Sequence, residues 1–180
     1  MVDLETGGVD PCHNPIIQLS AVRFDYATQT VGPIFDMCLD VPGNRFWDMD
    51  TIRWWNDNKG DLLDRILARA QPAEKVWNTF VDWTMDTSPT LTDNRLWAKP
   101  ISFEWPYLQS YGRQFGRELP FHYGNAIDLR SFCRGMANNP AAEALEKRMT
   151  FEGEKHNAID DVLNQIQVAF AAKILTAETA

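Results

Sequence analysis

The sequence predicts an α/β fold in which a mixed sheet is covered by helices. The first 40 residues contain three short segments with strand-like alternation, and most of the remaining chain has hydrophobic residues at helical spacing. A further strand-like segment lies between the later helices. Strands followed by helices and a later strand are typical of a mixed sheet covered by helices. With 180 residues, of which 44% are hydrophobic, the chain is expected to form one domain with a sizeable core.

The sheet is predicted to begin as an antiparallel meander of three strands. The strands are expected within 2–8, 16–24 and 31–39. Apolar residues lie on both faces of the second strand, which predicts a central position covered on both sides. In the first strand, Asp3 and Glu5 share one face and Val2 and Leu4 share the other, because strand side chains alternate.

Helical spacing dominates after the third strand. In chain order, the sequence predicts a helix capped by Asp50 or Thr51, helical segments over 62–70 and 73–84, a polar loop over 86–93, a short strand over 95–98, a helix starting at Pro106, a helix over 126–136 and a final helix starting near Asn157.

Composition narrows the class of function and the compartment. The net charge of −8 disfavours a protein that coats nucleic acid, but an enzyme whose bound metals supply positive charge stays compatible with it. No apolar run is long enough to span a bilayer, and we expect neither membrane association nor a secretory signal. The three cysteines, Cys12, Cys38 and Cys133, fit neither a disulfide framework nor a metal site, which favours a reducing cytoplasm.

The acidic pair in the first strand is a candidate metal site. Two carboxylates on one face repel each other unless a positive charge lies between them, and Mg²⁺ prefers such oxygen ligands. Taken alone, Asp3 and Glu5 also fit an acidic edge strand that faces water.

The start of the last helix supplies the second group of candidate residues. Asn157 can cap this helix, with Asp160 three positions on, in an arrangement like a capping box. His156 then lies just outside the helix and Asp161 lies in its first turn. A carboxylate there can bind a metal, and an imidazole with an ordinary pKa of ~6.5 can accept a proton from a water at neutral pH.

Together these motifs resemble those of the DEDD exonucleases, in the branch with a catalytic histidine. The matching residues are D-x-E at Asp3 and Glu5, H-x-A-x-x-D from His156 to Asp161, and Ser102-Phe103-Glu104 in place of the second motif. Within that group, the segments 50–55 and 127–130 are similar to the phage exonuclease A and mycobacterial RNase AS subset. The resemblance spans nearly the whole chain and implies an RNase H-like fold with a single exonuclease domain over residues 1–180.

The resemblance implies a 3′–5′ exonuclease that hydrolyses single-stranded RNA or DNA from its 3′ end and releases nucleoside 5′-monophosphates. Two Mg²⁺ or Mn²⁺ ions, about 4 Å apart, would be held by Asp3, Glu5, Glu104 and Asp161. His156 would accept the proton of the attacking water. The resemblance also suggests a homodimer.

Two further expectations concern the second motif and the substrate. The family normally has aspartate where this chain has Glu104, whose side chain is one methylene longer. Asp128 is a less favoured substitute, because the matching pattern gives it a structural role. The predicted contacts of the terminal nucleotide are Leu4, Thr6, Phe103 and Trp105, although core packing is the favoured role for Leu4.

Two alternatives to the exonuclease remain open. The replacement of aspartate by Glu104 is compatible with a non-catalytic module that keeps the exonuclease fold and binds nucleic acid. A different metal-dependent nuclease on an RNase H-like sheet would cut internally instead of at an end.

Overall fold

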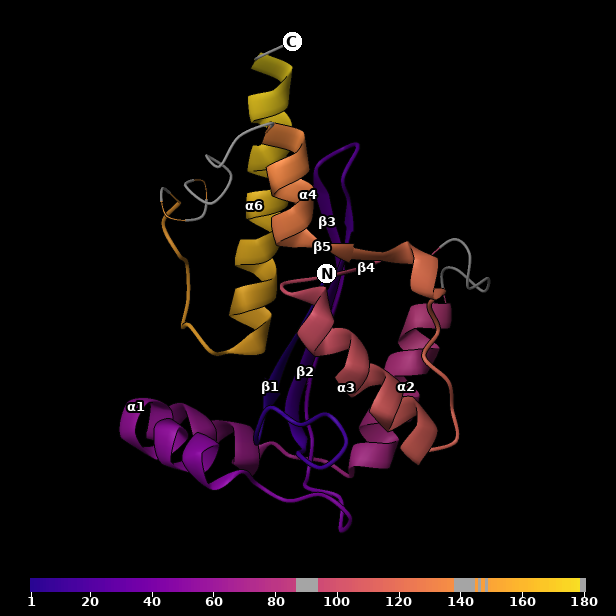
Figure 1. Ribbon diagram of the computed structural model, residues 1–180, viewed down its shortest axis with the longest axis vertical. Coiled ribbons are helices and arrows are strands. Elements are labelled where there is room, and N and C mark those ends of the chain that lie inside the picture. The colour runs from indigo at the N-terminus through magenta and orange to yellow at the C-terminus, as the bar shows by residue number, and fades with distance from the viewer. Residues whose placement is uncertain (87–93, 138–144, 146, 148, 179–180) are drawn as a thin grey trace.

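The computed structural model describes residues 1–86, 94–137, 145, 147 and 149–178, and it has a mixed α/β architecture (Figure 1). Strands β1 (Val2–Thr6), β2 (Ile16–Asp25) and β3 (Thr30–Cys38) form an antiparallel sheet in the order β1-β2-β3. A parallel pair, β4 (Leu96–Ala98) and β5 (Ala126–Asp128), lies with β4 beside β1. The predicted meander is confirmed, with β2 at its centre.

Helices lie on both sides of the three-stranded sheet (Figure 1). The described helices are α1 (Met49–Ala68), α2 (Ala73–Met85), α3 (Ile101–Gln114), the short 3₁₀ helix η1 (Tyr123–Asn125), α4 (Leu129–Ala137) and α6 (Ala158–Glu178). Helices α4 and α6 lie side by side on one face, α2 and α3 lie on the other, and α1 lies at the end of β1. Among the described helices, none is both long and apolar enough to cross a membrane.

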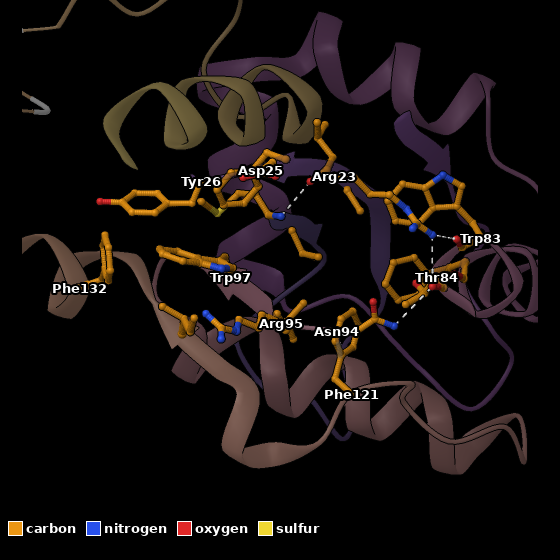
Figure 2. A pocket seen from close by; sticks show the side chains of 18 of the residues that line it. Arg23, Asp25, Tyr26, Trp83, Thr84, Asn94, Arg95, Trp97, Phe121 and Phe132 are labelled. Atoms are coloured by element: carbon orange, nitrogen blue, oxygen red, sulfur yellow. Dashed lines mark hydrogen bonds between the residues drawn. The ribbon is translucent and has the colours of Figure 1, made fainter. Parts of the chain in front are cut away.

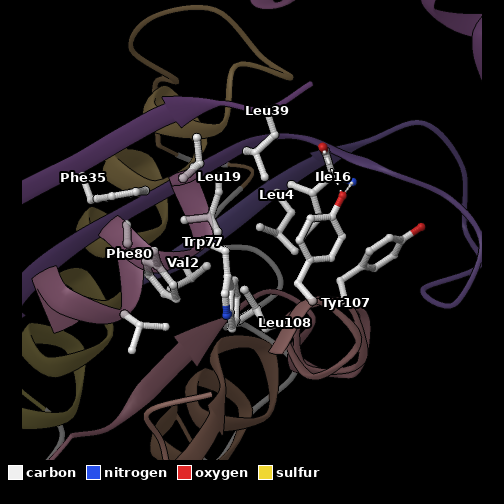
Figure 3. Packing of buried hydrophobic residues seen from close by; sticks show 14 of the residues in the cluster. Val2, Leu4, Ile16, Leu19, Phe35, Leu39, Trp77, Phe80, Tyr107 and Leu108 are labelled. Carbon is white, nitrogen blue, oxygen red and sulfur yellow. Dashed lines mark hydrogen bonds between the residues drawn. The ribbon is translucent and has the colours of Figure 1, made fainter. Parts of the chain in front are cut away.

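Alternation along β1 divides its side chains between the main core and the candidate site. Val2 and Leu4 point into a buried cluster with α2 and α3 that includes Trp77, Phe80 and Leu108 (Figure 3). A second cluster packs α4 and α6 against the rest of the fold. Asp3 and Glu5 therefore face α6, as the alternation of strand side chains predicts.

The start of α1 lies two or three residues before the predicted position. Its N-cap is Asp48, whose Oδ1 accepts hydrogen bonds from the backbone N–H and the hydroxyl of Thr51 (2.8 and 2.9 Å). The prediction of Asp50 or Thr51 as cap is wrong because the Asp48 N–H donates to the Gly7 carbonyl, 2.7 Å away. That bond to the end of β1 fixes where the helix begins.

The predicted start of α3 at Pro106 is also wrong, because α3 begins at Ile101 and Pro106 lies inside it. A proline inside a helix removes one backbone hydrogen bond, but the helix is held by burial of Tyr107 and Leu108. The Ile101 N–H donates to the carboxylate of Asp128 (3.1 Å), a partner that lies far away in the sequence. The earlier start puts Glu104 in the first turn of α3.

The predicted helix over 126–136 is correct only from Leu129 onward, because Ala126–Asp128 form β5. These residues extend because they pair with Leu96–Ala98, a long-range contact that helical spacing does not reveal. The final helix begins at Ala158, in agreement with its prediction. Of the expected polar loop over 86–93, only Asp86 lies within the described residues.

Candidate active site

Three acids from opposite ends of the chain meet between β1 and α6. One carboxylate oxygen from each of Asp3, Glu5 and Asp161 lies within 4.8 Å of the other two. Asp3 and Glu5 are 9% and 8% exposed, and Asp161 is half-buried. This spacing and burial suit a shared cation, because hard divalent ions take clustered carboxylate oxygens.

Burial raises the pKa of each acid, and repulsion from neighbouring acids of the cluster adds to this for Asp3 and Glu5. Burial, and then the charge of Asp161, raises the pKa of Asp3 to about 8. The pKa of Glu5 is raised well above its ordinary value by burial and then by the charge of Asp3. Burial also raises the pKa of Asp161. These acids are therefore held toward their neutral forms, and a bound cation would favour their ionised forms.

Glu104 lies next to this group but outside it. The three clustered acids do not include Glu104. Even so, the charge of Glu104 raises the pKa of Glu5, and the charge of Asp3 raises the pKa of Glu104. Glu104 is 3% exposed, and burial raises its pKa to about 9. Its Oε2 is buried without a hydrogen-bond partner among the described residues. An unpaired buried carboxylate oxygen is costly, and a cation is one partner that could satisfy it.

Asp128 contacts the helices and is not one of the clustered acids. Its carboxylate accepts the Ile101 N–H at the start of α3 and the Ser131 N–H at the start of α4 (3.1 and 2.8 Å). The expected structural role of Asp128 is therefore present in the structure.

Gln165 is a site residue that the sequence patterns missed. Its Nε2 donates to Oδ1 of Asp3 (2.8 Å), while its Oε1 is buried without a partner in the described part of the chain. Gln165 follows Asp161 by four positions, so both residues lie on one face of α6. That spacing was the signal available in the sequence.

His156 lies at the rim of the acid cluster. Its backbone N–H donates to Oδ2 of Asp161 (2.8 Å), and its φ of 69° is left-handed. Partial desolvation lowers the pKa of the imidazole below its ordinary value, which favours the neutral ring at pH 7. The expected place of His156 just before the helix and of Asp161 in its first turn is confirmed.

Side chains of β2, of the preceding loop and of α6 itself fix this helix start. Asn157 occupies the predicted cap position, but its Oδ1 accepts from Nε2 of Gln18 (2.9 Å). The Oε1 of Gln18 accepts the Ala158 N–H (3.2 Å). Asp160 accepts from the Glu154 N–H and from Nδ2 of Asn157 (both 2.9 Å), so it stabilises the loop and not only the helix end. The capping-box geometry is replaced by this network across to β2.

The predicted nucleotide contacts fall in different environments. Leu4 is part of the core, and the hydroxyl of Thr6 donates to the Gly8 carbonyl (2.6 Å). Phe103 and Trp105 are half-buried on either side of Glu104 in α3. Trp105 lines a separate cavity of about 310 Å³ to which none of the clustered acids contributes.

Two larger cavities differ in their relation to the acids. One, of about 360 Å³, is lined by His156 and Asp161 together with the basic residues Lys99, Lys147 and Lys155. The other, of about 800 Å³, is rich in aromatic residues and includes none of the predicted site residues (Figure 2). In that cavity the Arg23 guanidinium lies over the Trp83 ring and donates to the carbonyls of Trp83 and Thr84. The smaller, lysine-lined cavity is therefore the one that adjoins the candidate site.

Comparison with solved structures gives the class of the fold. The chain matches the nuclease domain of 3′hExo, a DEDDh family member bound to rAMP, with a TM-score of 0.70, 18% identity, and coverage of 98% of this chain and 90% of that one. Exonuclease I matches with a TM-score of 0.75 and 15% identity, over 98% of this chain and 42% of that one. Cell-death related nuclease 4 matches with a TM-score of 0.70 and 16% identity, over 98% of this chain and 62% of that one. The fold is thus the RNase H-like fold of the DEDDh exonucleases.

The family follows from the sequence itself. Residues 1–172 match the 3′-5′ exoribonuclease Rv2179c-like domain, and the chain belongs to that family. No curated protein matches the chain. The chain spans about 62% of cell-death related nuclease 4 and 42% of exonuclease I.

Proposed function

We propose that residues 1–180 form one exonuclease domain that hydrolyses single-stranded RNA or DNA from the 3′ end and releases nucleoside 5′-monophosphates. Membership of a 3′-5′ exoribonuclease family supports the reaction class. The observation that carries the proposal is the meeting of Asp3, Glu5 and Asp161, with oxygens within 4.8 Å of one another. We further propose that the protein is cytoplasmic, which its cysteine pattern favours, and that it acts as a homodimer, as the family resemblance suggests.

The donor set fits divalent cations, for which we propose two Mg²⁺ or Mn²⁺ ions. Asp3, Glu5 and Asp161 would hold them, and Glu104 would add its unpartnered Oε2. When bound, the cations would supply the positive charge that stabilises the phosphate as its negative charge grows. Gln165 would keep the Asp3 carboxylate oriented through its 2.8 Å hydrogen bond.

In the proposed reaction, a water oxygen attacks the terminal phosphorus while the bond to the 3′-oxygen of the preceding nucleotide breaks. His156 accepts the proton of that water, and a neutral imidazole at pH 7 suits this role. The leaving 3′-oxygen takes up a proton from a solvent water and ends as a hydroxyl. Lys99, Lys147 and Lys155 line the adjoining cavity and would attract the phosphate backbone of the strand. We assign Phe103 and Thr6 to the terminal base, and not Leu4, which belongs to the core, or Trp105, which lines a separate cavity.

The test is a Mg²⁺-dependent assay on matched RNA and DNA single strands labelled at the 5′ end. We expect a ladder that shortens from the 3′ end, release of mononucleotides, and loss of turnover in Asp161→Ala. Asp64→Ala, which removes an exposed acid on α1, serves as the matched control and should keep full activity.

Other products would point to the alternative functions. Internal fragments would indicate an endonuclease on the same fold. Binding of oligonucleotide without any turnover in Mg²⁺ or Mn²⁺ would indicate a non-catalytic module. Either result would contradict the proposed function.

A further inference from the structure

Two consecutive tryptophans of α1 lie in contrasting environments beside the candidate site. Trp55 is 2% exposed, and its Nε1 donates to the carbonyl of Thr6 at the end of β1 (3.2 Å). Trp54 is 40% exposed, which is unusual for so large an apolar side chain. The Trp54 ring meets the imidazole of His156 edge to face, with 4.8 Å between ring centroids and an interplanar angle of 73°.

The orientation of the His156 ring depends on contacts with other side chains. A catalytic imidazole is usually oriented by a hydrogen bond to one of its ring nitrogens. Within the described residues, the imidazole of His156 has no such hydrogen bond; the only bond of this residue runs from its backbone N–H to Asp161. The contact with Trp54 is therefore the specific interaction that restricts the ring.

Helix α1 also holds the loop that carries His156. This loop includes two left-handed residues, Gly153 (φ 96°) and His156 (φ 69°). Glu154, between them, forms ion pairs with Lys59 (3.8 Å) and with Arg65 of α1. Three side chains of α1, those of Trp54, Lys59 and Arg65, thus contact Glu154 or His156 of this loop.

We propose that Trp54 is a positioning residue that fixes the orientation of the His156 imidazole beside Asp161. Edge-to-face aromatic pairs favour one mutual geometry over others, and a base is effective only within reach of the proton it accepts. The kinetic part of this inference rests on the proposed role of His156 as the base. The contact itself does not depend on that role.

The contact is tested first by NMR of the three histidines in this chain, His13, His122 and His156. Trp54→Ala should shift the ring signals of His156, because the ring current of the indole is removed, and should leave those of His13 and His122 in place. Leu67→Ala, a matched control at a 41% exposed residue of α1, should move none of the three. Unchanged His156 signals in Trp54→Ala would overturn the proposal.

Kinetics then distinguish positioning from substrate binding. Trp54→Ala should lower kcat about 3- to 10-fold with KM within about twofold of wild type, as expected for loss of one aromatic contact. Trp54→Phe, which keeps a ring, should recover most of kcat. A rise in KM with kcat unchanged would mean that Trp54 stacks on a base of the substrate, and would contradict a positioning role.

A double-mutant cycle provides the decisive comparison. In a His156→Ala background, Trp54→Ala should cause no further loss, because its effect passes through the imidazole. An equal loss in both backgrounds would overturn the proposal. If His156→Ala itself turned over as fast as wild type, the proposed role of His156 as the base would fail, and positioning of that base by Trp54 would fail with it. The NMR experiment would still test the contact between Trp54 and His156, because it does not depend on activity.

Discussion

Asp3 shows at the scale of one residue how the candidate site opposes the stability of the fold. Its carboxylate is buried, receives one hydrogen bond from Gln165, and lies near the charges of Asp161 and Glu5. A carboxylate in this setting is a good cation ligand and a poor core residue. Natural sites often retain such groups at a cost in stability.

We therefore expect Asp3→Asn to stabilise the metal-free protein and to abolish turnover. The amide keeps the shape of the side chain but removes a buried charge and its repulsion with Asp161. Each kcal/mol gained should raise Tm by about 2–4 °C in a chain of this size. Thermal unfolding in EDTA at pH 8 measures the first effect and the oligonucleotide assay the second. A lower Tm together with retained activity would contradict both the burial argument and the proposed ligand role.

The replacement of aspartate by glutamate in the second motif gives a second prediction at this scale. Glu104→Gln should lower kcat/KM by about 100-fold, the typical cost of removing one group that stabilises charge in the transition state. The kcat/KM of Glu104→Asp should lie between those of Glu104→Gln and the wild type, because the aspartate side chain keeps the charge but is one methylene shorter. Glu118→Gln, at an exposed acid, is the matched control. Full activity in Glu104→Gln would exclude Glu104 from the site.

At the scale of the elements, contacts distant in sequence decide where the helices begin. Asp48 is tied to Gly7 at the end of β1, Gln18 of β2 accepts from the first N–H of α6, and Asp128 joins α3 to α4. Each of these bonds places a candidate residue: Asp161 in α6, Glu104 in α3 and Trp54 in α1. The positions at which these helices begin therefore determine where the candidate site residues lie.

Asp128→Ala should destabilise the protein more than the loss of an ordinary surface acid. It leaves the Ile101 N–H of α3 and the Ser131 N–H of α4 without a carboxylate, and one such cap is worth about 0.5–2 kcal/mol. Urea unfolding measures the loss. Asp25→Ala is the matched control, because Asp25 accepts two backbone N–H bonds within one exposed turn and joins no helices. An equal loss in both variants would contradict the bridging role of Asp128.

For the whole molecule, local sequence patterns predicted the structure correctly where the hydrophobic pattern is periodic. They failed where contact with a residue distant in the sequence decides the backbone conformation. Alternation in β1 predicted that Asp3 and Glu5 share a face, and the spacing of His156 and Asp161 predicted their places at the start of α6. No local pattern could show that Ala126 extends to pair with Leu96, or that α3 begins five residues before Pro106. Family resemblance, and not periodicity, linked the two ends of the chain.

The pH dependence of stability is a property of the whole set of acids. Between pH 4 and pH 8 the folded protein keeps a proton on Asp3, whose pKa is about 8, while the unfolded chain, with an ordinary value of 3.8, loses it. The folded state then binds more protons, so stability falls as pH rises through this window. Glu5, Glu104 and Asp161 act in the same direction. The buried Met1 amine, with its pKa lowered to about 5, and the His156 imidazole, whose pKa is lowered by partial burial, oppose them.

We expect the Tm of the metal-free protein to decrease from pH 5 to pH 8, and Mg²⁺ to raise Tm more at pH 8 than at pH 5. Cations bind the ionised acids and so stabilise the folded state by mass action. The same scans on Asp3→Asn should show a weaker dependence on pH. A metal-free Tm that rises steadily toward pH 8 would show that these acids are not protonated in the folded state.

The central claim is that Asp3, Glu5 and Asp161 share bound cations. Anomalous diffraction from crystals of the protein soaked in Mn²⁺ tests it most directly. The account predicts strong anomalous peaks within coordination distance of all three carboxylates, and their loss in Asp161→Ala crystals grown under the same conditions. Absence of a peak among these acids, with manganese bound elsewhere on the protein, would contradict it.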